Sequence, residues 1–193
     1  MNPVKSLLIA GVGGQGIILA SEIISEVLLE MGYDVKKNEI HGMAQRGGSV
    51  TSQIRYGDHV YSPKIPFHAA QLILALEYVE SARFLELLAP EGKILASRQT
   101  IIPTTVSIGG ANYPHDLESF YQSRQIPARF IPAHQIADQL GNPKTSNLVM
   151  LGFLNQEMRF DHQLWYTVIK RKVKPKFIDL NLQAFERGFE FTE

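Results

Sequence analysis

Six residues near the N-terminus have the spacing of a phosphate-binding loop. Residues 11–16 read Gly-Val-Gly-Gly-Gln-Gly and match the pattern G-x-G-x-x-G. Glycines at these spacings let the backbone turn tightly, and they let amide N–H groups at a helix N-terminus approach an anion. The pattern alone therefore favours a nucleotide or another phosphate-bearing ligand.

The same pattern opens the dinucleotide-binding fold, which also needs an acidic residue at the end of its second strand to hold a ribose hydroxyl. Asp34 comes too early along the chain for this role, and Glu39 lies in a polar stretch. NAD binding is therefore disfavoured, and a dinucleotide-dependent reductase with it. Another alternative stays open, in which the glycines serve only for close packing of a helix on a sheet.

A second cluster, residues 41–48, reads His-Gly-Met-Ala-Gln-Arg-Gly-Gly. Arg46 provides a permanent cation beside Gly47 and Gly48, which can adopt backbone angles that other residues avoid. A guanidinium next to exposed N–H groups suits a phosphate, a carboxylate or the backbone of a partner, and His41 adds a possible donor. The alternative interpretation is a turn in which Arg46 forms an internal salt bridge.

The elements that position the first motif follow from hydrophobic spacing. Residues 6–10 form a short apolar run, which is typical of a strand buried on both faces. Apolar residues then recur at spacings of three and four over 17–31, which predicts an amphipathic helix that Gly32 ends. The glycine loop is thus expected between a buried strand and a helix.

The rest of the chain predicts alternating strands and helices. Residues 49–56 alternate as a strand does, and a turn at 57–58 predicts a β-hairpin with 59–62, whereas the polar stretch 34–40 does not look like a central strand. Further strands are expected at 72–76, 93–96, 105–108 and 129–131, and helices at 79–88, 116–124, 134–140, 146–158, 161–172 and 180–188. We therefore expect one domain over residues 1–193, with a three-layer α/β fold, a mostly parallel sheet and an inserted β-hairpin.

Charge and residue content exclude several classes of function. The chain balances 19 Lys and Arg against 19 Asp and Glu, so it has no general basic excess for nucleic acid. We interpret the basic run 170–176 as a solvated helix end. No cysteine is present, which excludes disulfides and iron–sulfur ligation within the chain.

Other catalytic and targeting signals are missing from the sequence. The six histidines are scattered without metal-ligand spacing, so no metal site is expected. No G-x-S-x-G motif marks a serine hydrolase. There is no charged and apolar leader at the N-terminus and no run long enough to span a membrane, so we expect a cytoplasmic protein.

The two glycine-rich motifs, taken together and in this order, resemble the gamma subunit (domain III) of pyruvate and 2-oxoacid:ferredoxin oxidoreductases. The sequence of residues 41–48 is most similar to that of the beta subunit of indolepyruvate oxidoreductase. Further resemblance lies in residues 61–63, in the helix-to-turn passage 85–92 and in 147–152. The match therefore spans nearly the whole chain.

The resemblance implies a complex that uses thiamine diphosphate and magnesium to decarboxylate a 2-oxo acid. Two electrons then pass through iron–sulfur clusters to ferredoxin, and an acyl-CoA is released. This chain lacks a cysteine and the Gly-Asp-Gly start of a thiamine diphosphate–magnesium site. The resemblance thus implies a subunit without catalytic residues of its own that binds none of these cofactors alone, and a larger partner subunit that carries thiamine diphosphate and the clusters.

Within such a complex, the resemblance implies that this subunit completes the active-site cleft and helps to receive coenzyme A. The residues expected to contribute are Gly11, Gly13, Gly14, Gln15, Gly16, His41, Gln45, Arg46, Gly47, Gly48 and Asn147. The alternative from a different class is a stand-alone nucleotide-binding regulatory module that uses the loop 11–16. Selectivity for the 2-oxo acid should lie mainly on the partner that carries thiamine diphosphate.

Overall fold

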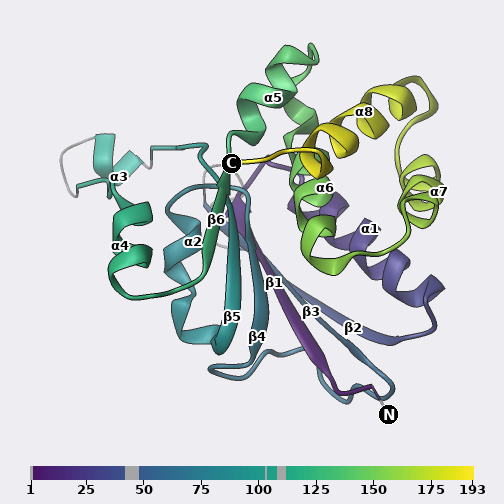
Figure 1. The fold of residues 1–193 in the computed structure, drawn as a ribbon, viewed down its shortest axis with the longest axis horizontal. Coiled ribbons are helices and arrows are strands. Elements are labelled where there is room, and N and C mark those ends of the chain that lie inside the picture. Colours follow the sequence, from purple (N-terminus) through teal and green to yellow (C-terminus); the bar gives the residue numbers. More distant parts are fainter. Residues whose placement is uncertain (1, 42–47, 103, 108–111) are drawn as a thin grey trace.

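A six-stranded sheet in the order β2-β3-β1-β4-β5-β6 runs through the molecule (Figure 1). The structure is a computed structural model that describes residues 2–41, 48–102, 104–107 and 112–193. The strands are β1 (Lys5–Val12), β2 (Asp34–His41), β3 (Ser49–Gly57), β4 (Ala70–Ala75), β5 (Leu88–Ser97) and β6 (Ala128–Ile131). Strands β1, β4, β5 and β6 are parallel, whereas β3 runs antiparallel to both β1 and β2. The predicted, mostly parallel sheet is confirmed.

Helices cover both faces of this sheet, as the three-layer prediction requires. In Figure 1, α1, α6, α7 and α8 lie on one side of the sheet, and α2 and α4 lie on the other. The helices are α1 (Ile17–Glu30), α2 (Glu80–Arg83), α3 (Thr104–Ser107), α4 (Leu117–Ser123), α5 (Ala133–Gln139), α6 (Ser146–Met158), α7 (His162–Lys172) and α8 (Ile178–Phe189), with single 3-10 turns η1 (Leu85–Leu87), η2 (Pro143–Thr145) and η3 (Pro175–Phe177).

Side chains on the two faces of β1 belong to two separate hydrophobic cores. Leu7 and Ile9 point into the core beneath α1 and α6, while Leu8 joins the core on the opposite face. Each of these side chains is at most 1% exposed, and complete burial of one such side chain contributes about 1.5–3 kcal/mol. A strand buried on both faces needs a continuous apolar run, which is the pattern of residues 6–10.

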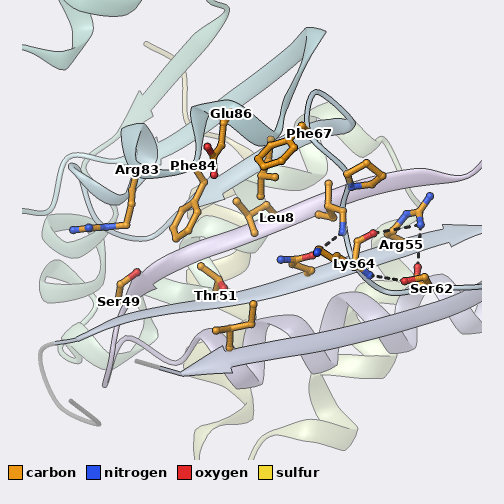
Figure 2. Close-up of a pocket in the computed structure, with 15 residues that line it drawn as sticks. Leu8, Ser49, Thr51, Arg55, Ser62, Lys64, Phe67, Arg83, Phe84 and Glu86 are labelled. Carbon is orange, nitrogen blue, oxygen red and sulfur yellow. Dashed lines mark hydrogen bonds between the residues drawn. The ribbon is translucent and has the colours of Figure 1, made fainter. Parts of the chain in front are cut away.

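The β-hairpin predicted at 49–62 is wrong in its second strand. β3 pairs with β2 and not with residues 59–62, so the polar stretch 34–41 is the edge strand of an antiparallel pair. Pro63 and Pro66 have no N–H to give to a ladder. Residues 60–67, which we call the strap, instead cross the sheet face and are held by side chains of β3 (Figure 2).

Two shorter predictions also differ from the structure. Residues 104–107 form the helical turn α3 and not a strand, because the edge of β5 where another strand could pair is occupied by β6. The helix expected at 79–88 is divided into α2 and η1, and β5 already begins at Leu88. The remaining elements lie within a few residues of the predicted positions.

Two residues of the basic run 170–176, at the end of α7, form ion pairs with α1. The Arg171 guanidinium contacts the carboxylates of Glu26 and Glu30 on α1 at 3.1 and 2.8 Å, and the Lys172 ammonium contacts Glu26 at 2.6 Å. These pairs are partly exposed to solvent, so each contributes little to stability. The interpretation of the run as a helix end is confirmed.

The part of the chain that the structure describes contains neither a membrane-spanning helix nor a cluster of metal-binding side chains. None of its helices combines the length and the apolar character that crossing a lipid bilayer requires. No three His, Asp or Glu side chains among the described residues gather in positions that could hold a metal ion.

Candidate anion-binding site at the glycine loop

The first motif forms the loop between β1 and α1. Gly14 and Gly16 have φ angles of 103° and 78°, in the left-handed region that side chains disfavour. Gly16 is the N-cap of α1, so the free N–H groups of the first helical turn lie next to the loop. A Cβ at Gly14 would meet nothing within 4 Å, so this part of the loop faces open space.

Gln15 holds the loop in place and does not face the open space with free hydrogen-bonding groups. Its Oε1 accepts from Val12 N–H at 2.7 Å. Its Nε2 donates to the Leu76 carbonyl at 2.8 Å and to Gln99 Oε1 at 2.9 Å. The side chain thereby joins the carboxyl ends of β1, β4 and β5. The amide positions the glycine loop, which is a different role from direct contact with a cofactor.

Gly11 and Gly16 are required for close packing. A Cβ on Gly11 would lie 2.7 Å from Gln15 Oε1, and one on Gly16 would lie 2.5 Å from Asn147 Nδ2. Asn147 is 2% exposed; its Nδ2 donates to the Gly16 carbonyl at 3.2 Å and its Oδ1 accepts from Leu148 N–H at 3.0 Å. Asn147 thus ties the first turn of α6 to the glycine loop, and the packing interpretation applies to these two glycines.

A cavity of about 310 Å³ opens beside the loop at the carboxyl end of the parallel strands. It is lined by Gly13, Gly14, Gln15, Gln99, Ile101, His134, Pro143, Lys144 and Ser146. Ser146 begins α6, and α1 begins beside Gly16, so two helix N-termini adjoin the same space. Partial positive charge at helix N-termini favours anions.

Side chains add positive charge to this cavity. Lys144 is exposed, and none of the ion pairs in the described part of the chain uses it. The His134 ring lies 3.5 Å from the Asp138 carboxylate on the same helix. None of the described residues that line the cavity has an acidic side chain. The Lys144 ammonium gives the cavity a positive charge, and the two helix N-termini give it N–H donors. The cavity therefore fits a phosphate or carboxylate group.

The second motif meets the first through the backbone. Gly13 N–H donates to the Gly48 carbonyl at 3.0 Å, so the end of residues 41–48 lies against the glycine loop. His41 is the last residue of β2, opposite Val50 of β3. Gln45, Arg46 and Gly47 lie outside the described residues. The structure thus brings the two motifs together at the end of β1.

A buried carboxylate fixes the wall of the cavity that carries Gln99 and Ile101. Glu77 is 2% exposed, and its Oε1 accepts from Ile101 N–H at 3.0 Å and from the Tyr113 hydroxyl at 2.5 Å. Its Oε2 accepts from the N–H groups of Val79 and Glu80 at 2.8 and 3.0 Å. Burial, and then the hydrogen bond to Glu77, raise the pKa of Tyr113. The phenol therefore stays a donor at neutral pH.

Sequence reasoning missed the residues that reach the cavity from other elements. Lys144 lies in η2 just before α6, His134 is the second residue of α5, and neither lies in a recognisable motif. One local signal was available for Lys144. Asn142 and Pro143 mark a turn before a helix start, where Asn142 Oδ1 accepts from Lys144 N–H at 3.1 Å. A cation at such a turn lies beside the free N–H groups of the helix.

Comparison with known proteins identifies relatives over the full length. A profile of the family described as pyruvate ferredoxin/flavodoxin oxidoreductase matches residues 6–191. The chain is 36% identical over 189 residues to indolepyruvate oxidoreductase subunit IorB of Pyrococcus horikoshii, an alignment that covers 95% of this chain and 93% of the relative. The resemblance stated on the two motifs is confirmed.

Solved structures share the fold. The gamma subunit of a keto/oxoacid ferredoxin oxidoreductase from Geobacter sulfurreducens matches with a TM-score of 0.71 and 21% identity, over 96% of each chain. The 2-oxoglutarate:ferredoxin oxidoreductase of Magnetococcus marinus, solved with 2-oxoglutarate, coenzyme A and succinyl-CoA bound, matches with a TM-score of 0.75 and 19% identity, over 96% of this chain and 30% of that one. With the fold, the profile and the full-length relative in agreement, this chain belongs to the pyruvate ferredoxin/flavodoxin oxidoreductase family.

Proposed function

We propose that residues 1–193 act as the gamma-type subunit of a 2-oxoacid:ferredoxin oxidoreductase of the indolepyruvate type. The observation that carries the proposal is the full-length likeness to IorB, at 36% identity. The chain has no cysteine, so the iron–sulfur clusters would reside on a larger partner subunit, together with thiamine diphosphate and magnesium. The partner would perform the decarboxylation and pass electrons to ferredoxin.

We further propose that the cavity at the glycine loop receives a phosphate-bearing part of coenzyme A. Its volume of about 310 Å³ is at the lower end of the range for ligand pockets, which suits a diphosphate better than the entire cofactor. The Gly14 N–H, the Ser146 end of α6 and the Lys144 ammonium would hold the anion. Coenzyme A would supply the thiol that accepts the acyl group.

The residues of the second motif are proposed to extend this surface. Gly48, which follows Gln45, Arg46 and Gly47 in the sequence, lies against Gly13 at the edge of the cavity. Arg46 and His41 would give further donors for an anionic group of coenzyme A or for a carboxylate of the partner. Gln15 and Asn147 would contribute by positioning the loop, because their amide groups are engaged within the chain.

The first test is activity with and without the larger subunit. The purified chain alone should show no coenzyme A-dependent oxidation of indolepyruvate, because it has no cysteine to ligate a cluster. Coexpression with the thiamine diphosphate-bearing subunit should give a complex that reduces ferredoxin. Activity of the single chain would contradict the proposal. So would failure to associate combined with a thermal shift by nucleotides, which is the result expected for a stand-alone regulatory module.

A second prediction concerns Lys144 in the assembled enzyme. Lys144→Ala should remove one charge-assisted contact to a phosphate, worth about 1.5–3 kcal/mol, and so raise the KM for coenzyme A by about 10- to 100-fold. The KM for the 2-oxo acid should change little. Lys174→Ala is the matched control, because Lys174 is also exposed but lies away from the cavity. Equal values of the coenzyme A KM in both variants would place the coenzyme elsewhere.

A further inference from the structure

A second and larger cavity lies on the other side of the molecule's sheet. It has a volume of about 860 Å³ and runs along β3, on the face opposite α1 (Figure 2). Its floor consists of alternate β3 residues, from Ser49 through Thr51 and Gln53 to Arg55. The six steps along the strand from Ser49 to Arg55 span about 20 Å at about 3.3 Å each. We call this elongated cavity the β3 groove.

The helical turns α2 and η1 border this stretch of the sheet through Arg83, Glu86 and Leu87. α1 packs on β2 and β3, but it does so against Val50 and Ile54, which point away from the groove. On the groove side the cover is the strap, residues 60–67, together with Phe84. The strap is anchored by Ile65 N–H to Gln53 Oε1 at 2.7 Å and by Arg55 Nη1 to the Ser62 carbonyl at 3.0 Å. The sheet therefore presents a formed groove where a three-layer fold has room for a further element.

Apolar side chains stand in solvent along the rim of the groove. Phe67 at the end of the strap is 66% exposed, and Ile40 of β2 is 50% exposed. The next residue after Phe67, His68, has a φ angle of 58°, in the left-handed region. A left-handed residue other than glycine costs about 1–2 kcal/mol, and His68 N–H is fixed by the Glu86 carbonyl at 3.0 Å. The backbone thus holds Phe67 outward at a cost in free energy.

The charges around the groove have one predominant sign. Arg55 and Lys64 lie at one end of the groove, and Arg83, which is paired with the Glu80 carboxylate at 2.8 Å, lies at the other end near Ser49 (Figure 2). Glu86 is the acidic residue among those that line the groove. A second copy of this chain that presented the same face would bring like charges together. A surface with carboxylates at its ends would instead complement the groove.

We propose that the β3 groove is the surface on which the larger, thiamine diphosphate-bearing subunit docks. This inference rests on the proposed function. The partner would contribute an apolar segment that covers Phe67 and Ile40, followed by a carboxylate that pairs with Lys64 at the end of the groove where Arg55 also lies. A small molecule inside the groove would leave the exposed rim in solvent, whereas a protein segment covers the floor and the rim together. An aromatic anchor surrounded by polar contacts is the usual centre of a protein interface.

The test measures binding of the purified chain to the immobilised larger subunit. Phe67→Asp should raise the Kd by about 30-fold or more, as expected when an aromatic anchor is lost. Lys64→Glu should raise the Kd by about tenfold at low salt, and the difference should shrink at high salt. Both side chains are exposed, so the melting temperature of the free chain should not change. Leu29→Asp is the matched control for Phe67→Asp, because Leu29 is 55% exposed on α1 behind the sheet.

Each result has a distinct meaning. If the wild-type chain binds and Phe67→Asp binds as tightly as Leu29→Asp, the docking surface is wrong although the proposed function stands. If the wild-type chain does not bind the larger subunit at all, the proposed function fails first. If the free chain is a dimer that Phe67→Asp converts to a monomer, the groove is occupied by a second copy and the inference is overturned.

Discussion

Gly152→Ala should destabilise the protein by about 3 kcal/mol or more. A Cβ at Gly152 on α6 would lie 1.8 Å from the Phe185 carbonyl oxygen of α8, and one at Gly188 would lie 1.9 Å from the Val149 carbonyl oxygen. These are contacts with backbone, so the two helices must move apart to admit a methyl group. Urea unfolding of the purified chain, followed by circular dichroism, measures the loss.

Packing and helix propensity predict opposite changes in stability for Gly152→Ala. Propensity alone predicts that alanine stabilises a helix interior by about 1 kcal/mol relative to glycine. Gln183→Ala on the exposed side of α8 is the control and should stay within about 0.5 kcal/mol of wild type. Gly188→Ala should reproduce the large loss, since it blocks the same crossing. A more stable Gly152→Ala variant would mean that α6 and α8 do not approach this closely.

Glu77→Ala should remove several kcal/mol of stability and loosen the wall of the cavity beside the glycine loop. Four donors converge on this buried carboxylate: the N–H groups of Val79, Glu80 and Ile101 and the hydroxyl of Tyr113. A hydrogen bond to a charged acceptor contributes about 1.5–3 kcal/mol, so we expect a loss of about 3 kcal/mol or more after partial rehydration. Hydrogen exchange should accelerate most at the Ile101 amide.

Two further variants define the meaning of the Glu77 result. Glu77→Gln keeps the shape and one acceptor oxygen, so it should cost less than Glu77→Ala. Glu118→Ala is the control, since it removes only the exposed pair with Arg98 and should cost less than about 1 kcal/mol. Equal stabilities of Glu77→Ala and Glu118→Ala would show that water replaces the carboxylate without penalty.

The parts of the fold that the sequence predicted well are those set by local patterns. The apolar run of β1, the glycine loop and the helical spacing of α1 depend on neighbouring residues, and all three lie where expected. The buried stripe of α7, with Trp165, Val168 and Ile169, follows the same rule. The pairing of β3 could not be derived in this way. A strand pattern does not name its partner, and the turn at 57–58 suggested the wrong neighbour.

The residues of the candidate site can be divided in the same way, into those that a local pattern reveals and those that only the fold brings together. The loop 11–16 was visible because its four glycines lie close together in the sequence, and two of them, Gly11 and Gly16, are in close contact with the side chains of Gln15 and Asn147. Gln99 and His134 come together because β5 and β6 are parallel and end at one edge of the sheet, and Lys144 reaches the same cavity from η2, which follows α5. Knowledge of the strand order would have placed the residues that follow these strands in one pocket.

The hydrogen bond between Asn147 and Gly16 has a consequence for the folding of the chain during its synthesis. Its two residues are 131 positions apart in the chain. During synthesis from the N-terminus, β1 and α1 leave the ribosome long before the start of α6. Contacts of such long sequence separation also form slowly after release. The glycine loop therefore acquires its mature shape among the last parts of the molecule, so a nascent or truncated chain that stops before Asn147 would have the motif without the site.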